Sequence, residues 1–486
     1  MGCHSSSNLH RILIPLLVAG LGLTGCSVNP ATGERQLSLL SEAQEIAIGK
    51  ENDAQIVASM GLYPDEEWQE YIQDLGGRLA AASERPNLPW TFRIVDDPIV
   101  NAFALPGGFI YISRGILAHF NSEAELASVV GHEIGHVTGR HGVERMSKAQ
   151  LANVGLGVAA IASPRFRGYA GLAQQSLALL FLKFSRDDER QADDLGLRYM
   201  VRDGFNAEEM PKVFQTLDRV SSAGGSSLPN WLSTHPAPAN RAVRIGEAVA
   251  QLPPDARGGR IERDAYMARI DNLTFGSNPR EGYVVGNTFY HPDMAFALDF
   301  PEGWEIVNQR QAVGAMSPDK DAVVVLTLAD KSSKNEALQD FFQQDGVTAG
   351  DRWQEFFYFK AAQGAQTQGG QAPPELWGLV GMIEHQDQLF RLLSYTPENR
   401  WQSRGEPMKT SLRSFRKLTE RRYLDVQPKR IRLVKLKKDM TLEEFHRKYP
   451  STIDLPQLAT LNGADASTSF KKGTTVKRVV GGKLPK

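Results

Sequence analysis

Two histidines and a glutamate stand at a spacing that can bind and use a metal ion. The chain reads His132-Glu133-Ile134-Gly135-His136, and apolar residues recur around it at helical spacing. On a helix the two imidazoles lie one turn apart on the same side, so both can bind one cation. Zinc suits neutral imidazole and lowers the pKa of bound water toward about 7. Glu133 is then placed to act as general base, the arrangement expected for peptide hydrolysis.

A third ligand must come from another part of the chain, and we weigh two candidates. The long metzincin pattern needs a histidine three residues after Gly139, but His141 comes one residue early, so we reject that pattern. Glu189 and Asp193 share one face of a second expected helix. We expect Glu189 to bind the zinc, while Asp193 accepts the spare N–H of a zinc histidine. An acidic pair alone is usually solvated, but beside His132 and His136 the metal interpretation is favoured.

The motif helix is expected to begin at a capping box formed by Ser122 and Glu125. Two further helices are expected before it, near residues 41–58 and 66–82. Turn signals separate three short strand candidates that lie between these helices and the motif: 90–95, 99–105 and 109–113. Two apolar stretches, 151–163 and 169–184, are too short or too polar to span a bilayer, so we interpret them as core helices.

The first residues have the layout of an export signal. His10 and Arg11 precede an apolar run over 12–23, which is too short for a membrane-spanning helix. The tetrapeptide Leu23-Thr24-Gly25-Cys26 resembles the bacterial lipobox, which implies lipidation of Cys26 and removal of residues 1–25. Several acyl chains on one residue would hold the protein on a membrane without spanning it. Ser27 after Cys26 favours, by resemblance, the outer membrane; a plain signal peptide is the alternative.

Composition limits what the rest of the chain can be. Its 486 residues suggest two to four domains. Both cysteines, Cys3 and Cys26, lie at the start, so any metal site in the body must use His, Asp or Glu. Residues 421–486 carry 16 Lys and Arg against 6 Asp and Glu. Such a basic region suits an anionic envelope polymer or lipid surface, or is a solvated face, and nucleic acid is a poor candidate for an exported protein.

These motifs together resemble peptidase family M forty-eight, the gluzincin zinc proteases, over about residues 26–251. The resemblance implies a mainly helical, zincin-like protease with a small β-sheet, which binds one Zn²⁺ per chain. It implies His132, His136 and Glu189 as ligands, Glu133 as base, and Asp193 as partner of a zinc histidine. The segments that carry the resemblance are His132–His136, Glu189–Asp193, Asn101–Gly108 and Asn29–Gly33.

The resemblance also implies how substrate and a further histidine approach the zinc. Substrate would add as a strand to an exposed sheet edge, supplied by either of two strands. The residues of these alternatives are Ala102, Phe103 and Ala104, or Phe109 and Ile110. His235 follows a Gly- and Ser-rich loop and is either a fourth ligand that shuts the resting enzyme or an oxyanion stabiliser with Arg241 nearby. A structural capping histidine is the third alternative.

Two accessory regions follow a protease domain expected over 26–270. Residues 283–420 alternate strands and helices and are expected to form an α+β domain, whose opening resembles a PsbP-like fold. Residues 428–486 resemble a divergent, basic LysM module, a small α/β unit that grips glycan. No 34-residue repeat is visible, which excludes a tetratricopeptide tail.

We therefore expect a lipid-anchored zinc endopeptidase in the periplasm, attached to the outer membrane. Its expected substrates are unfolded or stalled envelope polypeptides, with peptidoglycan or an outer-membrane assembly machine as further candidate partners. Two other functions stay open. One is a chaperone or assembly factor with a latched zinc site, and the other is a peptidoglycan-remodelling metalloenzyme. The intact Glu133 argues against a scaffold, which needs no base beside the metal.

Overall fold

A computed structural model of the chain describes residues 26–160, 183–223, 231, 234–235, 238–331, 333–362 and 375–485. The expected signal peptide, 1–25, lies outside this part, as does nearly all of the apolar stretch 169–184. Within the described part, no helix is long and apolar enough to cross a membrane.

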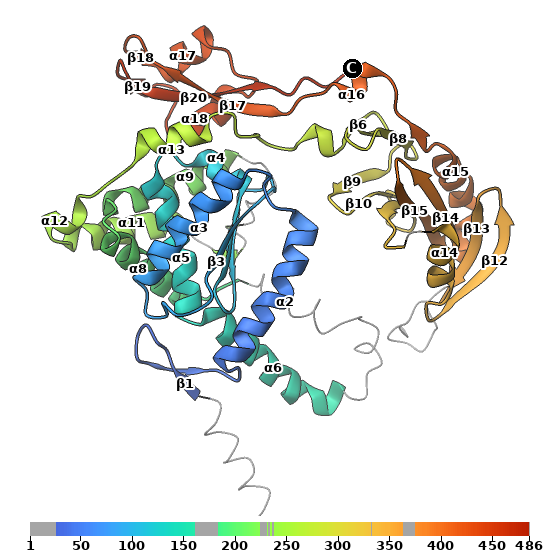
Figure 1. Cartoon of the computed structure of the whole chain (residues 1–486), viewed down its shortest axis with the longest axis horizontal. Coiled ribbons are helices and arrows are strands. Elements are labelled where there is room, and N and C mark those ends of the chain that lie inside the picture. The colour runs from blue at the N-terminus through green and yellow to red at the C-terminus, as the bar shows by residue number, and fades with distance from the viewer. Residues whose placement is uncertain are drawn as a thin grey trace, which may run out of the picture.

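The N-terminal half is mainly helical, with a small sheet at one side (Figure 1). Its sheet has the order β3-β5-β4, with β3 parallel and β4 antiparallel to the central β5. A short hairpin, β1 with β2, precedes the helices. The strands are β1 (Cys26–Val28), β2 (Arg35–Leu37), β3 (Thr91–Val95), β4 (Ala102–Leu105) and β5 (Phe109–Ser113). The helices are α2 (Glu42–Met60), α3 (Glu66–Ala81), α4 (Arg114–His119), α5 (Glu123–Thr138), α6 (His141–Ala160), α8 (Arg186–Arg202), η2 (Ala207–Glu209), α9 (Met210–Ala223), α11 (Pro238–Gln251), α12 (Pro254–Arg257) and α13 (Arg263–Ile270).

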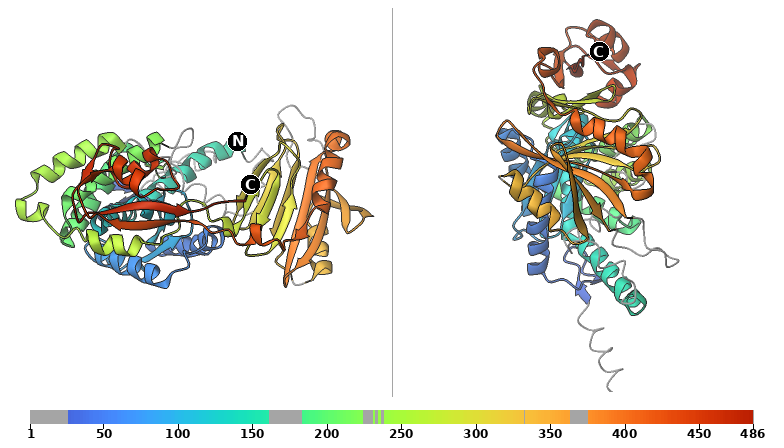
Figure 2. Two further views of the ribbon diagram at one scale, coloured as in Figure 1. Left: turned by 90° about the horizontal axis from the view of Figure 1, so that it is seen from above. Right: turned by 90° about the vertical axis from the view of Figure 1, so that its right-hand side faces the viewer.

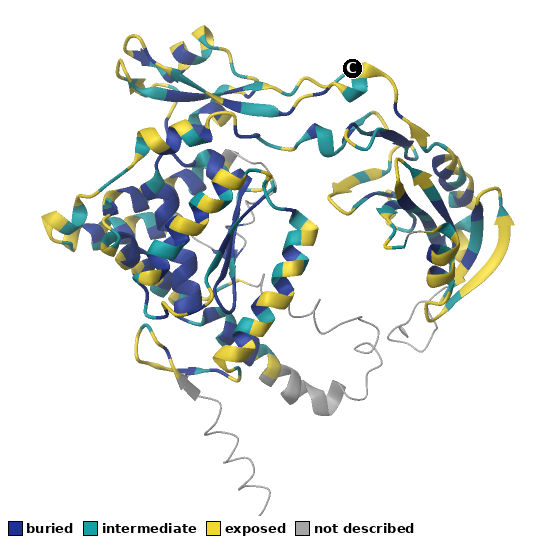
Figure 3. Cartoon of the chain, viewed as in Figure 1, coloured by how far each residue is buried: buried dark blue, intermediate teal, exposed yellow. Residues whose placement is uncertain are grey.

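Helix α5 is the centre of this half, and each of its residues from Ala124 to Thr138 is buried (Figure 3). Ser122 caps it by accepting a hydrogen bond from Glu125 N, as the sequence predicts. The reciprocal half of the predicted capping box differs, because the Glu125 carboxylate accepts from Asn121 N instead. Helix α8 is capped by a complete capping box between Ser185 and Asp188.

The middle region is rich in strands and has its own apolar clusters. Its main sheet is antiparallel, in the order β12-β13-β14-β15-β11-β10-β9, and a second sheet has the order β16-β8-β7-β6. The strands are β6 (Tyr283–Val285), β7 (Thr288–His291), β8 (Phe296–Asp299), β9 (Glu305–Gln309), β10 (Ala312–Met316), β11 (Val323–Leu328), β12 (Val347–Trp353), β13 (Phe356–Ala361), β14 (Leu376–His385), β15 (Gln388–Pro397) and β16 (Arg416–Lys417). Its helices are η3 (Pro279–Glu281), α14 (Lys334–Phe342), η4 (Glu398–Arg400), α15 (Trp401–Arg413) and α16 (Arg421–Leu424).

The C-terminal region lies across the helical half rather than apart from it (Figures 1 and 2). A long antiparallel pair, β17 with β20, encloses two short helices and a small second pair. Its buried residues belong to one continuous apolar cluster with α3, α5 and α9. Its elements are β17 (Lys429–Lys435), β18 (Met440–Thr441), α17 (Leu442–Lys448), α18 (Leu455–Leu461), β19 (Ser469–Phe470) and β20 (Thr475–Gly481).

One charged side chain of this region enters the helical core. Lys477 of β20 is fully buried, and its Nζ donates to the carbonyl oxygens of Ala118 and Phe120, each at 2.9 Å. Both carbonyls lie directly before α5. The basic C-terminal region is thus part of the packing that supports the motif helix.

Candidate metal centre

Glycines let α5 and α8 approach closely enough for one site to form between them. A Cβ added to Gly135 would lie 2.8 Å from the carbonyl oxygen of Ala192, and one added to Gly196 would lie 2.8 Å from His132 N. Real Cβ atoms do not make such contacts, so only glycine allows this backbone separation. The approach brings Glu189 of α8 beside the two histidines of α5.

Three of the predicted ligands meet at this crossing. His132 Nε2 lies 3.0 Å from His136 Nε2. Glu189 Oε1 lies 3.5 Å from His136 Nε2, and Glu189 Oε2 lies 3.8 Å from His132 Nε2. All three side chains are buried. The structure therefore brings together His132 and His136 of α5 and Glu189 of α8, which were expected on two separate helices.

His235 joins the same group. Its Nδ1 is 2.8 Å from Glu189 Oε1 and 3.3 Å from His132 Nε2. One ligand atom from each of His132, His136, Glu189 and His235 fits within 4.8 Å of all the others. The Trp231 ring stacks on the His235 imidazole, with centroids 4.8 Å apart and planes at 22°. His235 points at the ligand atoms, an orientation that fits a fourth ligand better than a helix cap.

The second ring nitrogen of His132, Nδ1, faces the carboxylate of Asp193, as expected. This nitrogen lies 3.0 Å from Asp193 Oδ1. Arg241 of α11 binds the same carboxylate through two nitrogens, at 2.6 and 3.0 Å, and its Nη1 lies 2.7 Å from Glu189 Oε2. Arg244, which the sequence analysis did not single out, adds a contact of 3.0 Å to Asp193 Oδ2. Its position one turn after Arg241 on a helix is a signal that spacing alone could have given.

The positive charge of Arg241 on α11 helps to keep the carboxylates of Asp193 and Glu189 ionised. Burial raises the pKa of Asp193, but Arg241 and His132 outweigh burial and hold the pKa at about 2. Burial likewise raises the pKa of Glu189, and His235 and Arg241 bring it well below its ordinary value. Burial keeps the pKa of His136 well below that of free imidazole. A neutral imidazole and an ionised carboxylate are the forms that bind metal.

Glu133 stands apart from these pairs. Both of its carboxylate oxygens are buried and have no hydrogen-bond partner among the described residues. Its Oε1 lies 3.7 Å from His235 Nε2, which is too long for a hydrogen bond. Buried polar atoms are normally paired, so an unpaired carboxylate next to the ligand group indicates a role in chemistry.

The donor set fits a metal ion. Two imidazole nitrogens from α5, one ionised carboxylate and a third imidazole converge on one point. His132 Nε2 and His136 Nε2 face each other at 3.0 Å with no carboxylate between them. A cation between them satisfies both lone pairs, and the N and O donors are those that zinc prefers.

A second contact of His136, on the nitrogen away from the ligand group, was missed by sequence reasoning. His141 Nδ1 lies 2.9 Å from His136 Nδ1, and His141 Nε2 lies 2.8 Å from Gln191 Oε1. His141 is not a member of the ligand group, in agreement with our rejection of the metzincin pattern.

The sheet edge beside the site is formed by β4. This strand is an outer strand of the sheet, whereas β5 lies in the middle, paired on both sides. The alternative edge, with Phe109 and Ile110, is therefore wrong, because both backbone edges of β5 already pair with neighbours. Ala102, Phe103 and Ala104 are the edge-strand residues that remain.

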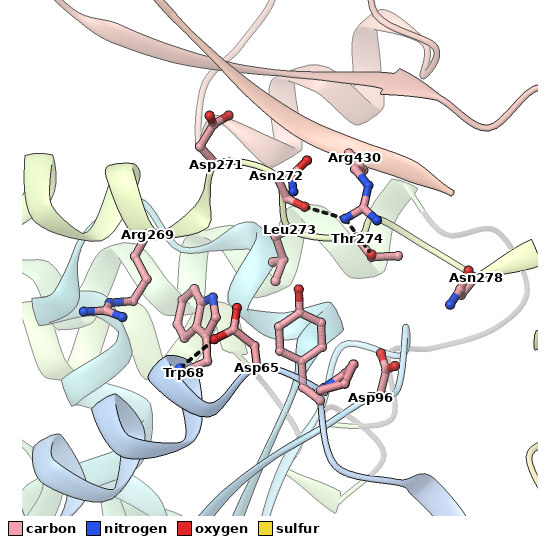
Figure 4. Close-up of a pocket in the computed structure, with 12 residues that line it drawn as sticks. Asp65, Trp68, Asp96, Arg269, Asp271, Asn272, Leu273, Thr274, Asn278 and Arg430 are labelled. Atoms are coloured by element: carbon pink, nitrogen blue, oxygen red, sulfur yellow. Dashed lines mark hydrogen bonds between the residues drawn. The ribbon is translucent and has the colours of Figure 1, made fainter. Parts of the chain in front are cut away.

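Little open space reaches the ligand group. A cavity of about 20 Å³ lies between Ala104 and Leu105 of β4, His136 of α5, and Phe184. A larger cavity, of about 310 Å³, lies elsewhere, between α3, the segment after α13, and β17 (Figure 4). It is lined by Trp68, Arg269 and Arg430 among others and contains none of the four ligands, so volume does not identify this site.

Comparison with known proteins agrees with the geometry. Residues 66–249 match the model of Peptidase family M48. A putative beta-barrel assembly-enhancing protease of Vibrio cholerae is 32% identical over 278 residues, covering 54% of this chain and 56% of that protein. The beta-barrel assembly-enhancing protease of Escherichia coli is 31% identical and covers 50% and 51%. Mitochondrial metalloendopeptidase OMA1 of Arabidopsis thaliana is 34% identical and covers 38% and 37%. The chain thus spans about half the length of these bacterial relatives.

Among solved structures, the cyanobacterial PsbP of Synechocystis is 14% identical, with a TM-score of 0.20, and covers 28% of this chain and 95% of that one. A TM-score this low supports no conclusion about fold, and the PsbP-like domain stays a prediction.

Proposed function

We propose that the chain is a zinc-dependent endopeptidase of unfolded or misassembled envelope proteins, because residues 66–249 match the model of Peptidase family M48. The observation that carries the proposal is the buried group of His132, His136 and Glu189, with the unpaired carboxylate of Glu133 beside it. Two bacterial relatives, a putative beta-barrel assembly-enhancing protease of Vibrio cholerae and the beta-barrel assembly-enhancing protease of Escherichia coli, support an envelope role.

The chain's own residues divide the work of hydrolysis. His132, His136 and Glu189 hold zinc, which when bound lowers the pKa of water and polarises the substrate carbonyl. Glu133 takes a proton from the attacking water onto a carboxylate oxygen and passes it to the leaving amine. Asp193 orients His132 through Nδ1, and Arg241 fixes Asp193 and Glu189 together. The burial of all these groups excludes bulk water and strengthens each interaction.

Substrate is proposed to pair with β4, an outer strand of the sheet β3-β5-β4. The small cavity between this strand and His136 marks where a peptide backbone would pass the ligand group. Edge pairing recognises backbone more than side chains, which suits varied unfolded substrates.

His235 is proposed to shut the resting site as a fourth ligand. Its Nδ1 contact to Glu189 and its burial support a position that a bound water or substrate would otherwise take. The His235→Ala variant should then cleave peptides faster than the unaltered chain. Slower cleavage would favour oxyanion stabilisation, and an unchanged rate would favour a structural histidine.

The regions outside the protease domain are proposed to hold the enzyme at the outer membrane and near its partners. Lipidated Cys26, the first residue of β1, would anchor the chain to the outer membrane from the periplasm. The C-terminal region is proposed to be a LysM-like module for peptidoglycan, which its strand, helices and strand order support. The 283–420 region is proposed to be a PsbP-like docking domain for assembly machinery.

The experiment that tests the function compares the full chain with its Glu133→Gln variant. Zinc per chain is quantified, and casein digestion is followed for both. Near-stoichiometric zinc in both proteins, with cleavage lost in Glu133→Gln, is the expected result. Zinc without cleavage in either protein would favour the chaperone alternative, and a chain without zinc would refute the ligand assignment. Release of muropeptides from sacculi would favour peptidoglycan remodelling.

A further inference from the structure

The zinc-facing orientation of His136 depends on a histidine that is not a ligand. His141 is the first residue of α6, and its Nδ1 lies 2.9 Å from His136 Nδ1. Both rings are buried, with 3% and 2% of their surfaces exposed. The turn between the two helices uses Arg140 with a positive φ of 58°, and α6 begins directly after it at His141. His141 therefore approaches His136 from the side opposite the ligand group.

The direction of each hydrogen bond in this contact follows from the ligand geometry. His136 Nε2 faces the other ligands, so a metal takes the lone pair of Nε2 and the ring proton lies on Nδ1. His136 Nδ1–H then donates to His141 Nδ1, which must carry a lone pair. The proton of neutral His141 is consequently on Nε2, from which it donates to Gln191 Oε1 at 2.8 Å.

A residue near the start of the described chain completes the arrangement. Asn29 Nδ2 donates to the same Gln191 Oε1 at 3.0 Å and to the carbonyl oxygen of Gly139 at 3.2 Å. The amide oxygen of Asn29 is itself held by Ala31 N at 2.9 Å. Gln191 Oε1 thus accepts two hydrogen bonds, which keeps its oxygen, not its amide nitrogen, toward His141.

Gly139 leaves the space that this contact requires. A Cβ at this position would lie 2.5 Å from His141 Nε2 and 2.6 Å from Gln191 Oε1. Any larger residue would separate these two atoms.

We propose that His141 is a positioning residue that orients His136 for zinc, and that Gln191 and Asn29 set the tautomer it needs. The inference rests on the proposed zinc enzyme and adds residues from α6, α8 and the N-terminal hairpin to its metal centre. Asn29 lies three residues after Cys26, the proposed lipidation site, so the proposed anchor would lie close in sequence to a residue that contacts this shell.

The test measures zinc affinity of the full chain by competition with a chelator. The His141→Leu variant removes the acceptor and should weaken zinc binding by about 10- to 100-fold, the usual effect of losing an outer partner of a metal ligand. His141→Asn places an amide oxygen where Nδ1 was and should restore most of the affinity. His119→Leu is the matched control, since His119 is a partly buried histidine in the same half that ends α4, before α5, and is not a member of the ligand group.

Two further measurements separate orientation from general damage. Co²⁺-loaded His141→Leu should show a shifted visible absorption spectrum, because the geometry of His136 changes, while the His119→Leu spectrum stays unchanged. Asn29→Asp keeps the acceptor for Ala31 N but cannot donate to Gln191, and should weaken zinc binding severalfold.

The outcomes distinguish failure of this inference from failure of the proposed function. If the unaltered chain binds zinc and His141→Leu binds it equally tightly with the same Co²⁺ spectrum, the positioning role is refuted. If His119→Leu weakens zinc binding as much as His141→Leu, the effect is general and the inference is also refuted. If the unaltered chain binds no zinc, the proposed function itself has failed.

Discussion

Helix α5 carries buried charged groups at both of its ends, and the two ends are built differently. At the start, Glu125 accepts a hydrogen bond from Asn121 N at 2.7 Å, and Lys477 donates to two carbonyl oxygens beside it. At the far end, both oxygens of Glu133 lack hydrogen-bond partners among the described residues. The Glu125 carboxylate and the Lys477 ammonium have hydrogen-bond partners and support the fold, whereas the Glu133 carboxylate stays unpaired beside the ligand group. Burial alone therefore does not mark a functional site; an unpaired carboxylate next to metal-binding side chains does.

The strongest test of this comparison applies one substitution to each end of the helix. Glu133→Gln should lower kcat/KM by about 10²- to 10⁴-fold, the usual contribution of a general base, with folding stability and zinc content retained. Glu125→Gln should leave kcat/KM per folded chain unchanged and lower the free energy of unfolding, because Lys477 loses a nearby carboxylate. Protease assays and urea unfolding of the two full-length variants measure both quantities. A loss of activity from Glu125→Gln equal to that from Glu133→Gln would abolish the distinction.

Substitution of Lys477 is a second test of the buried group at the start of α5. Lys477→Met should destabilise the chain by about 1–3 kcal/mol, because the buried carbonyl oxygens of Ala118 and Phe120 lose their hydrogen-bond donor. Adding Glu125→Gln to that variant should recover part of the loss, since no buried charge is then left unpaired. Urea unfolding of the two single variants and the double variant gives the coupling energy. Additive effects would show that the two side chains do not interact.

The same pair makes stability depend on pH. Burial lowers the pKa of Lys477 from 10.5 to about 7, although Glu125 acts in the opposite direction. Between about pH 7 and 10 the unfolded chain holds this proton and the folded chain does not, so stability rises with pH by up to about 1.4 kcal/mol per unit. Burial raises the pKa of Glu125 to about 7, so its contribution falls as pH rises from 4.5 to 7. Unfolding followed across this range should lose its alkaline rise in Lys477→Met and keep it in Lys471→Met, whose lysine is exposed.

The smallest expected effect concerns the close approach of α5 and α8 near Glu133. Gly135→Ala places a Cβ 2.8 Å from the carbonyl oxygen of Ala192, and such overpacking costs about 1–3 kcal/mol of stability. Gly77→Ala in α3 is the control, since its added Cβ meets no atom within 4 Å and should be neutral or stabilising. Zinc affinity should fall in Gly135→Ala alone, because α8 carries Glu189 away from the histidines. Equal behaviour of the two variants would mean that α5 and α8 can separate without affecting the site.

The part of the site that sequence could predict is the part that local spacing encodes. Helical periodicity places His132 with His136 and Glu189 with Asp193, and the structure brings all four together. The contact of His141 with His136 depends on a turn at Arg140 and on Gln191 from another helix, so no local pattern indicates it.

The fold shows the same division between local and distant information. The continuous apolar residues of 109–113 predicted the strand β5, whereas no such pattern marks β12, which lies at a sheet edge and is mostly exposed. The central position of β5 was also not predictable, since strand order depends on pairing between distant segments. A basic C-terminal region indicates a solvated surface, yet Lys477 is buried because two distant carbonyl groups accept its hydrogen bonds.

The position of β20 separates, along the sequence, the candidate ligands from the packing that supports their helix. This strand places Val476, Lys477 and Val479 into the core around the start of α5. In a chain made from its N-terminus, the candidate ligands are present long before this strand is. Completion of the packing around α5 is thus coupled to the synthesis of a strand far away in the sequence.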